Sequence, residues 1–170
     1  RALCDKYDIL MVADEVMSGW YRTGKCFAFM NFGYEPDMIT FAKGCTCGYV
    51  PLGGVVMQAR IAEFFDDHVM GCGLTYSAHP VGCAAAVATI NEYKRLDIEA
   101  NVAKSGKVLA DILDGYVDSH PCVGEVRHIG LFSAIELVRD KTTREPLVPF
   151  GRDPEGIMAK VIGMLKSDGF

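Results

Sequence analysis

Three residues with different polar groups, Asp14, Lys43 and Thr75, each lie where the chain leaves a predicted strand or enters a predicted helix. Asp14 directly follows the apolar segment 8–13, and Lys43 directly follows the apolar segment 38–42. In open α/β sheets, ligands bind at the carboxyl ends of the strands. These three positions are therefore candidates for one binding or catalytic site.

The side chains of this set suggest a particular kind of ligand. An Asp14 carboxylate partly buried at a sheet edge needs a cationic or hydrogen-bonding partner. Lys43 after an apolar strand is expected to be desolvated, which favours a neutral amine that attacks carbonyls. Thr75 and Ser77 precede a predicted helix, whose N-terminus suits a phosphate. A carboxylate for a ring nitrogen, an amine for an aldehyde and hydroxyls for a phosphate are together the groups that hold pyridoxal phosphate.

Each residue alone also has an ordinary structural interpretation. An Asp at the end of a strand usually caps a turn, and a Lys in that position usually reaches solvent. Only the combination points to the cofactor.

Two other motifs are weaker. The segment 19–26 is close to the GxxxxGK[ST] phosphate loop, but it ends in Cys26 where a magnesium-binding hydroxyl is needed, and it carries bulky Trp, Tyr and Arg side chains. His68, Cys72, His79 and Cys83 form two pairs at a spacing of four, which could suit a metal. The glycines around Cys72 disfavour a helix there, so a structural role is favoured for this group.

Alternation of strand-like and helix-like segments predicts an α/β protein. We expect strands buried on both faces of the sheet, a short helix near 61–65, and two long helices, the first starting at a proline. We expect a domain boundary near Asp97. The predicted strands are 8–13, 38–42, 52–57, 124–129 and 131–138, the predicted long helices are 80–96 and 98–117, and a turn at 139–144 precedes a last helix at 153–166.

Composition excludes several classes of function. The formal net charge is −5, with no long basic stretch, which argues against a nucleic-acid partner. The longest nearly uncharged apolar run, 81–90, is too short to span a bilayer, so no membrane partner is expected. Seven cysteines without a CxxC pair favour a reduced, cytoplasmic protein. The start without Met and the end inside an unfinished helix lead us to expect a fragment of a longer protein.

Five short motifs follow one another along the chain: Ala13–Val16, Arg22–Lys25, Ala42–Gly44, Pro51–Gly54 and Thr75–Pro80. Taken together and in this order, they resemble the signature of class III pyridoxal-phosphate aminotransferases. Within that class, two further segments, 124–132 and 143–146, look most like taurine:pyruvate and related omega-amino-acid:pyruvate enzymes. The chain departs from this signature at two places. It has Trp20-Tyr21 where the family more commonly has Phe-Gly, and Ala78 where the family usually has Gly.

The resemblance implies a role for each matching residue. Asp14 would pair with the pyridine nitrogen of the cofactor, and Val16 would pack on one face of its ring. Lys43 would hold the cofactor covalently, be displaced by the substrate amine, and then move the proton as general base and acid. Thr75 would bind the cofactor phosphate, usually across a dimer interface, which makes a homodimer the expected active form.

The resemblance also implies the type I fold of pyridoxal-phosphate transferases. Residues 1–96 would form the latter part of the large cofactor domain, and residues 97–170 would begin the small C-terminal domain. Because both domains would be incomplete, this piece alone is expected to be inactive or poorly active.

The expected reaction transfers an amino group from an omega-amino donor, such as taurine or β-alanine, to pyruvate or a similar 2-oxo acid. Two alternatives remain. One is an aminomutase or a decarboxylase that uses the same cofactor. The other is a non-catalytic homologue that keeps the fold for assembly or regulation.

Overall fold

The structure, a computed structural model, describes residues 1–170. They form two units. The first comprises Arg1–Lys107 and Ile129–Phe132, and the second comprises Val108–His128 and Ser133–Phe170. The assignment of 1–96 and 97–170 to two domains of a longer protein stays a prediction.

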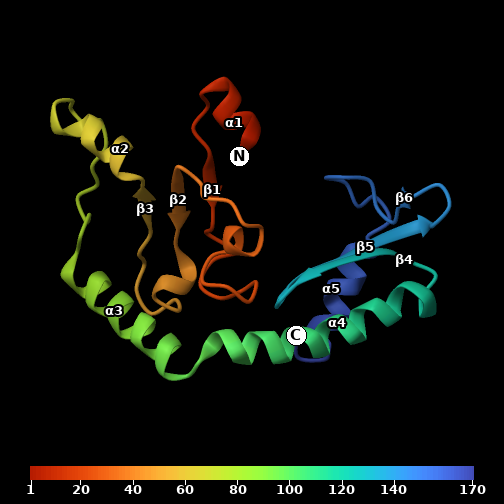
Figure 1. The fold of residues 1–170 in the computed structure, drawn as a ribbon. Helices are drawn as coiled ribbons and strands as arrows, with labels where there is room; N and C mark the ends of the chain where they lie inside the picture. The colour runs from red at the N-terminus through yellow and green to blue at the C-terminus, as the bar shows by residue number, and fades with distance from the viewer. The chain divides into compact units, whose positions relative to one another are not determined.

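The first unit contains a mixed three-stranded sheet, whose strands Figure 1 shows side by side in the order β1-β2-β3. Strand β1 runs parallel to β2, with Asp14 opposite Thr40, and β3 runs antiparallel to β2. The elements of this unit are α1 (Ala2–Tyr7), β1 (Val12–Asp14), η1 (Ala28–Asn31), β2 (Met38–Phe41), η2 (Lys43–Cys45), β3 (Gly54–Met57), α2 (Ala59–Ala62), η3 (Glu63–Asp66) and α3 (Pro80–Arg95), and α4 (Ile98–Ser119) begins in it.

The two long predicted helices are confirmed. Helix α3 begins at Pro80, whose missing N–H costs nothing in a first turn, and His79 caps it by accepting a hydrogen bond from the Val81 N–H at 3.3 Å. Helix α4 has an apolar face that buries Val102 and Leu113. Asp97 separates the two helices in a left-handed conformation, with φ of 45°.

The predicted strand at 8–13 is wrong in its bounds. Helix α1 occupies Ala2–Tyr7 and ends at Asp8 in a left-handed conformation, so pairing starts only at Val12. The prediction that the strands are buried on both faces of the sheet is also wrong, because Val12, Val55 and Val56 are about half exposed. An apolar sequence shows that a strand can be covered, whereas its burial depends on elements that pack over it.

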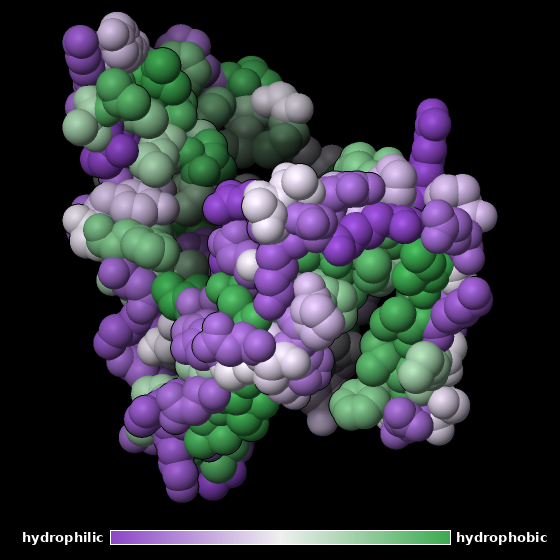
Figure 2. Space-filling model, turned by 90° about the vertical axis from the view of Figure 1, so that its right-hand side faces the viewer, coloured by the Kyte–Doolittle hydropathy of each residue, from purple (hydrophilic) through white to green (hydrophobic).

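Fully buried apolar side chains are few, and many apolar side chains reach the surface. Figure 2 shows green apolar patches between purple polar ones on the face that it presents. The buried apolar residues are Cys45, Val102, Leu113, Val123 and Val138.

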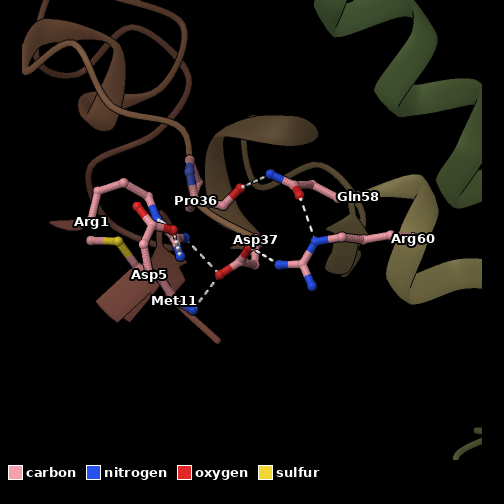
Figure 3. A network of polar contacts seen from close by, with 7 residues as sticks. All are labelled: Arg1, Asp5, Met11, Pro36, Asp37, Gln58 and Arg60. Carbon is pink, nitrogen blue, oxygen red and sulfur yellow. Dashed lines mark hydrogen bonds and ion pairs between the residues drawn. The ribbon is translucent and has the colours of Figure 1, made fainter. Parts of the chain in front are cut away.

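A polar network ties α1 to the sheet (Figure 3). The buried Asp37 carboxylate accepts hydrogen bonds from Arg1 and from the Met11 N–H, each at 2.7 Å, and it also pairs with Arg60. These contacts, with that of Arg1 first, lower the pKa of Asp37 to about 2. Met11 directly precedes β1 and Asp37 directly precedes β2, so the network fixes the amino-terminal ends of these two strands. This is the end of the sheet opposite to Asp14 and Lys43.

The second unit contains most of a second three-stranded sheet, in the order β4-β5-β6. Strands β4 (Val123–Ile129) and β5 (Phe132–Asp140) match the two predicted strands, and α5 (Ile157–Ser167) starts later than predicted. The observed turn is shorter than the predicted one at 139–144. Strand β5 continues to Asp140 and pairs with β6 (Glu145–Pro146), which was not predicted. No helix of either unit is both long enough and apolar enough to cross a membrane.

Candidate active site

Asp14 lies at the carboxyl end of β1, beside the end of the neighbouring parallel strand. Its Oδ1 accepts hydrogen bonds from the Thr40 hydroxyl at 3.0 Å and from the Val16 N–H at 3.1 Å. The Glu15 N–H continues the pairing by donating to the Thr40 carbonyl at 2.9 Å. Asp14 is therefore held in one orientation by groups of both strands.

Lys43 follows β2 at the same edge of the sheet and opens the short 3-10 helix η2. Its backbone is left-handed, with φ of 49°. Cys45 and Thr46, two and three positions after Lys43, anchor the turn, because both are buried and the Thr46 hydroxyl donates to the Val50 carbonyl at 2.6 Å. Burial also raises the pKa of the Cys45 thiol, so it stays a neutral packing group. The backbone of Lys43 is fixed while its amine is free to reach a ligand.

The expectation that Asp14 and Lys43 are buried is wrong for this chain, since both residues are exposed. The physical reason is that Tyr93 of α3 and Trp20 pack against the turn of Lys43 at Gly44, while no element covers the side chains of Asp14 and Lys43 themselves. Asp14 Oδ2 and the Lys43 amine have no hydrogen-bond or ion-pair partner in the structure. A carboxylate oxygen that can still accept a proton donor, and a primary amine that can still react, fit the ring nitrogen and the aldehyde of pyridoxal phosphate.

Thr75 lies on a different loop from these two residues. It is exposed on the loop before α3 and lines a cavity of about 880 Å³ with the 51–53 segment and the rest of the 74–78 loop. Neither Asp14 nor Lys43 lines this cavity. The loop is shaped by Ser77, whose hydroxyl accepts from the Leu74 N–H at 3.2 Å, and by Ala78, which has φ of 55°. The structure thus brings together two of the three predicted groups.

Val16 is half-buried in the turn after β1, where its N–H orients Asp14. The structure adds Glu15, which sequence reasoning missed as a separate contributor. Its buried carboxylate accepts from the Ser18 hydroxyl at 2.6 Å and from the Ala28 and Phe29 N–H groups at 2.9 Å. Glu15 thereby fixes the loop that follows Asp14, and an acid next to an acid at a strand end was the only sequence signal.

Trp20 and Tyr21 form an aromatic cluster with Phe27, Phe41 and Tyr93. Both have left-handed backbones, with φ of 58° and 69°. In this cluster Trp20 packs against Gly44, in the turn that carries Lys43.

Two of the four candidate metal ligands have other partners. His68 Nδ1 contacts the Phe64 carbonyl at 2.8 Å, and the ring is stacked on that of Phe64. His79 caps α3 as described. No group of three or more His, Cys, Asp and Glu side chains is placed to hold a metal ion.

The comparison with protein families decides the identity of the chain. The model of the family "Aminotransferase class-III" matches residues 1–167. The chain belongs to the class III aminotransferase family. This confirms the resemblance that the short motifs suggested.

Individual aminotransferases agree with this assignment. The chain is 38% identical over 154 residues to diaminobutyrate–2-oxoglutarate transaminase of Halomonas elongata, covering 88% of this chain and 33% of that protein. It is 35% identical over 175 residues to taurine–pyruvate aminotransferase of Bilophila wadsworthia, covering 99% and 37%. The chain therefore spans about a third of the length of the curated relatives that it matches.

Among solved structures, the taurine:2-oxoglutarate aminotransferase of Bifidobacterium kashiwanohense, in complex with PLP (pyridoxal phosphate) and glutamate, is 53% identical. It matches with a TM-score of 0.94 over 99% of this chain and 38% of that one. An (S)-enantioselective omega-transaminase of Thermomicrobium roseum matches with a TM-score of 0.82 at 44% identity, over 87% of this chain and 33% of that one. This confirms that the mixed α/β fold is part of the fold of class III aminotransferases.

Proposed function

We propose that the full-length protein is a pyridoxal-phosphate-dependent transaminase, for which this chain supplies the amine and the carboxylate that hold the cofactor. The observation that carries the proposal is the parallel pairing of β1 with β2, which sets Asp14 and Lys43 at one edge of one sheet. When bound, pyridoxal phosphate supplies an electron-withdrawing ring that stabilises a carbanion on the substrate carbon.

In this proposal each residue of the edge has one task. Asp14 accepts a hydrogen bond from the protonated ring nitrogen and keeps it protonated, and Thr40 and the Val16 N–H hold the carboxylate in place for that contact. Val16 packs on one face of the ring. Lys43 holds the cofactor, gives way to the substrate amine, and then moves the proton at the substrate carbon with its freed amine.

The proposed donor is an omega-amino acid, taurine or a β-alanine-like amine, and the proposed acceptor is pyruvate or a similar 2-oxo acid. Support comes from the taurine–pyruvate enzyme at 35% identity and from the taurine:2-oxoglutarate enzyme at 53%. The higher identity of the second favours testing 2-oxoglutarate beside pyruvate.

Product analysis of the full-length protein tests the reaction. Taurine or β-alanine is incubated with pyruvate or 2-oxoglutarate in the presence of pyridoxal phosphate, with the Lys43→Ala variant as control. We expect alanine or glutamate to form at a rate that the control lacks. Release of carbon dioxide, or rearrangement of the amine without an oxo acid, would instead establish a decarboxylase or an aminomutase.

We also propose a homodimer in which Thr75 serves the site of the other protomer, because neither Asp14 nor Lys43 lines the cavity that Thr75 lines. Mixed dimers of Lys43→Ala and Thr75→Ala protomers test this. If Thr75 acts across the interface, half of the sites in a mixed dimer lack both groups and the other half are intact, so activity returns on mixing. Activity that stays at the level of the two separate variants would show that both residues serve one protomer.

A further inference from the structure

The carbonyl of Gly44, next to Lys43, is held by a side chain from a distant helix. Tyr93, near the end of α3, donates its hydroxyl to the Gly44 carbonyl at 2.7 Å. The same carbonyl accepts the Cys47 N–H at 3.4 Å, which closes the turn after Lys43. Figure 1 shows this turn, below β2, beside the last turns of α3. A side-chain hydrogen bond across 49 positions therefore fixes the Gly44–Cys45 peptide, the second peptide after the Lys43 Cα.

The Tyr93 hydroxyl has a second partner, the Cys47 thiol, at 3.0 Å. Burial in the first place, and the contact with Cys47 after it, raise the pKa of Tyr93. Tyr93 therefore remains a protonated donor over the pH range in which proteins work.

Aromatic packing keeps the turn from shifting away from Tyr93. A Cβ on Gly44 would come within 2.7 Å of Trp20 Cβ, so Trp20 lies directly against the turn. The Trp20 ring packs on the Tyr93 ring with centroids 6.4 Å apart, and the Tyr21 ring meets Tyr93 edge-on at 5.6 Å. Gly44 is confined between Trp20 and the Tyr93 hydroxyl.

We infer that Tyr93 is a positioning residue, which holds the left-handed backbone of Lys43 through the Gly44 carbonyl and so aims the amine. The inference rests on the proposed function of Lys43 as the residue that holds the cofactor. In this inference Tyr93 does not contact the cofactor and acts only through the turn that follows Lys43. Left-handed backbone is unfavourable for a lysine, so a fixed partner is needed to keep the turn in this state.

The test compares Tyr93→Phe with the full-length wild type, because phenylalanine keeps the ring packing and removes only the hydroxyl. Tyr116→Phe on α4, whose ring stacks on His120, is the matched control for losing a tyrosine hydroxyl elsewhere. Two quantities are measured: hydrogen exchange of the Thr46 and Cys47 amides without cofactor, and the rate at which pyridoxal phosphate becomes fixed to Lys43 by borohydride.

One hydrogen bond contributes enough to change these quantities roughly fivefold. We expect Tyr93→Phe to raise exchange of the two amides, and to slow cofactor attachment, by about that factor. A lowered kcat with a nearly unchanged KM would agree, and Tyr116→Phe should match the wild type. Cys47→Ser, which keeps a hydrogen-bonding group beside the Tyr93 hydroxyl, should stay nearer to the wild type than Tyr93→Phe.

Unchanged exchange and unchanged attachment in Tyr93→Phe would overturn the inference, including the case in which only the melting temperature falls, because Tyr93 would then be a packing residue. If the wild type itself does not attach the cofactor, the proposed function fails. The exchange measurement would then still decide whether Tyr93 holds the turn.

Discussion

Gly106 offers a sharp test of the packing in the first unit. It is buried in α4, and a Cβ there would come within 2.8 Å of the Gly130 carbonyl oxygen and within 3.0 Å of its Cα. Gly130 cannot easily withdraw, because the following Leu131 N–H donates to the Arg22 carbonyl at 2.9 Å. We predict that Gly106→Ala destabilises the protein.

The magnitude follows from comparison with Gly115→Ala in the same helix, where a Cβ would have no neighbour within 4 Å. Both changes gain helix propensity, about 0.5–1 kcal/mol each, and this gain cancels in the difference. Overpacking in a well-packed site costs about 1–3 kcal/mol. Gly106→Ala should therefore be about 1–3 kcal/mol less stable than Gly115→Ala.

Urea unfolding of the two full-length variants and the wild type measures this difference from the midpoints and slopes. The expected order of stability is Gly115→Ala, then wild type, then Gly106→Ala. Equal stability of the two variants would refute the close contact between α4 and the 130 segment.

Three further changes have defined outcomes. Asp37→Asn should be less stable than the wild type at neutral pH, and the gap should narrow as the pH falls from about 4 towards 2, because the folded pKa of about 2 lies below the ordinary 3.8; a gap in urea unfolding that is independent of pH would contradict this. Ala78→Gly should stabilise the folded protein by about 1 kcal/mol, because only glycine adopts φ of 55° without strain; a lower urea midpoint would contradict it. Thr40→Val should weaken binding of pyridoxal phosphate roughly fivefold, because Asp14 loses one of its two orienting donors; equal affinity in a fluorescence titration would contradict it.

Local signals in the sequence were enough to predict the long helices and the edge of the sheet where the candidate site lies. Pro80 and the alanines after it define the start of α3, and the apolar segments before Asp14 and Lys43 predict neighbouring strand ends. The parallel register of β1 and β2 confirms this placement of the two residues.

Properties that depend on distant contacts could not be predicted. The exposure of Asp14 and Lys43 depends on what packs over them, and the contact of Tyr93 with Gly44 joins two helices that no sequence pattern connects. The predicted start of β1 was wrong because residues 9–11 are as apolar as the residues of a strand. In the structure, helix α1 ends at Asp8 and strand pairing begins only at Val12.

The most direct test of the central claim is the visible absorbance of the full-length protein with pyridoxal phosphate, beside its Lys43→Ala variant, before and after borohydride. We predict a band in the wild type that borohydride fixes covalently to Lys43, located by mass spectrometry of the peptides, and no fixed cofactor in the variant. A folded wild type with no band, or a cofactor fixed to another lysine, would contradict the assignment of Lys43 and of this edge of the sheet as the site.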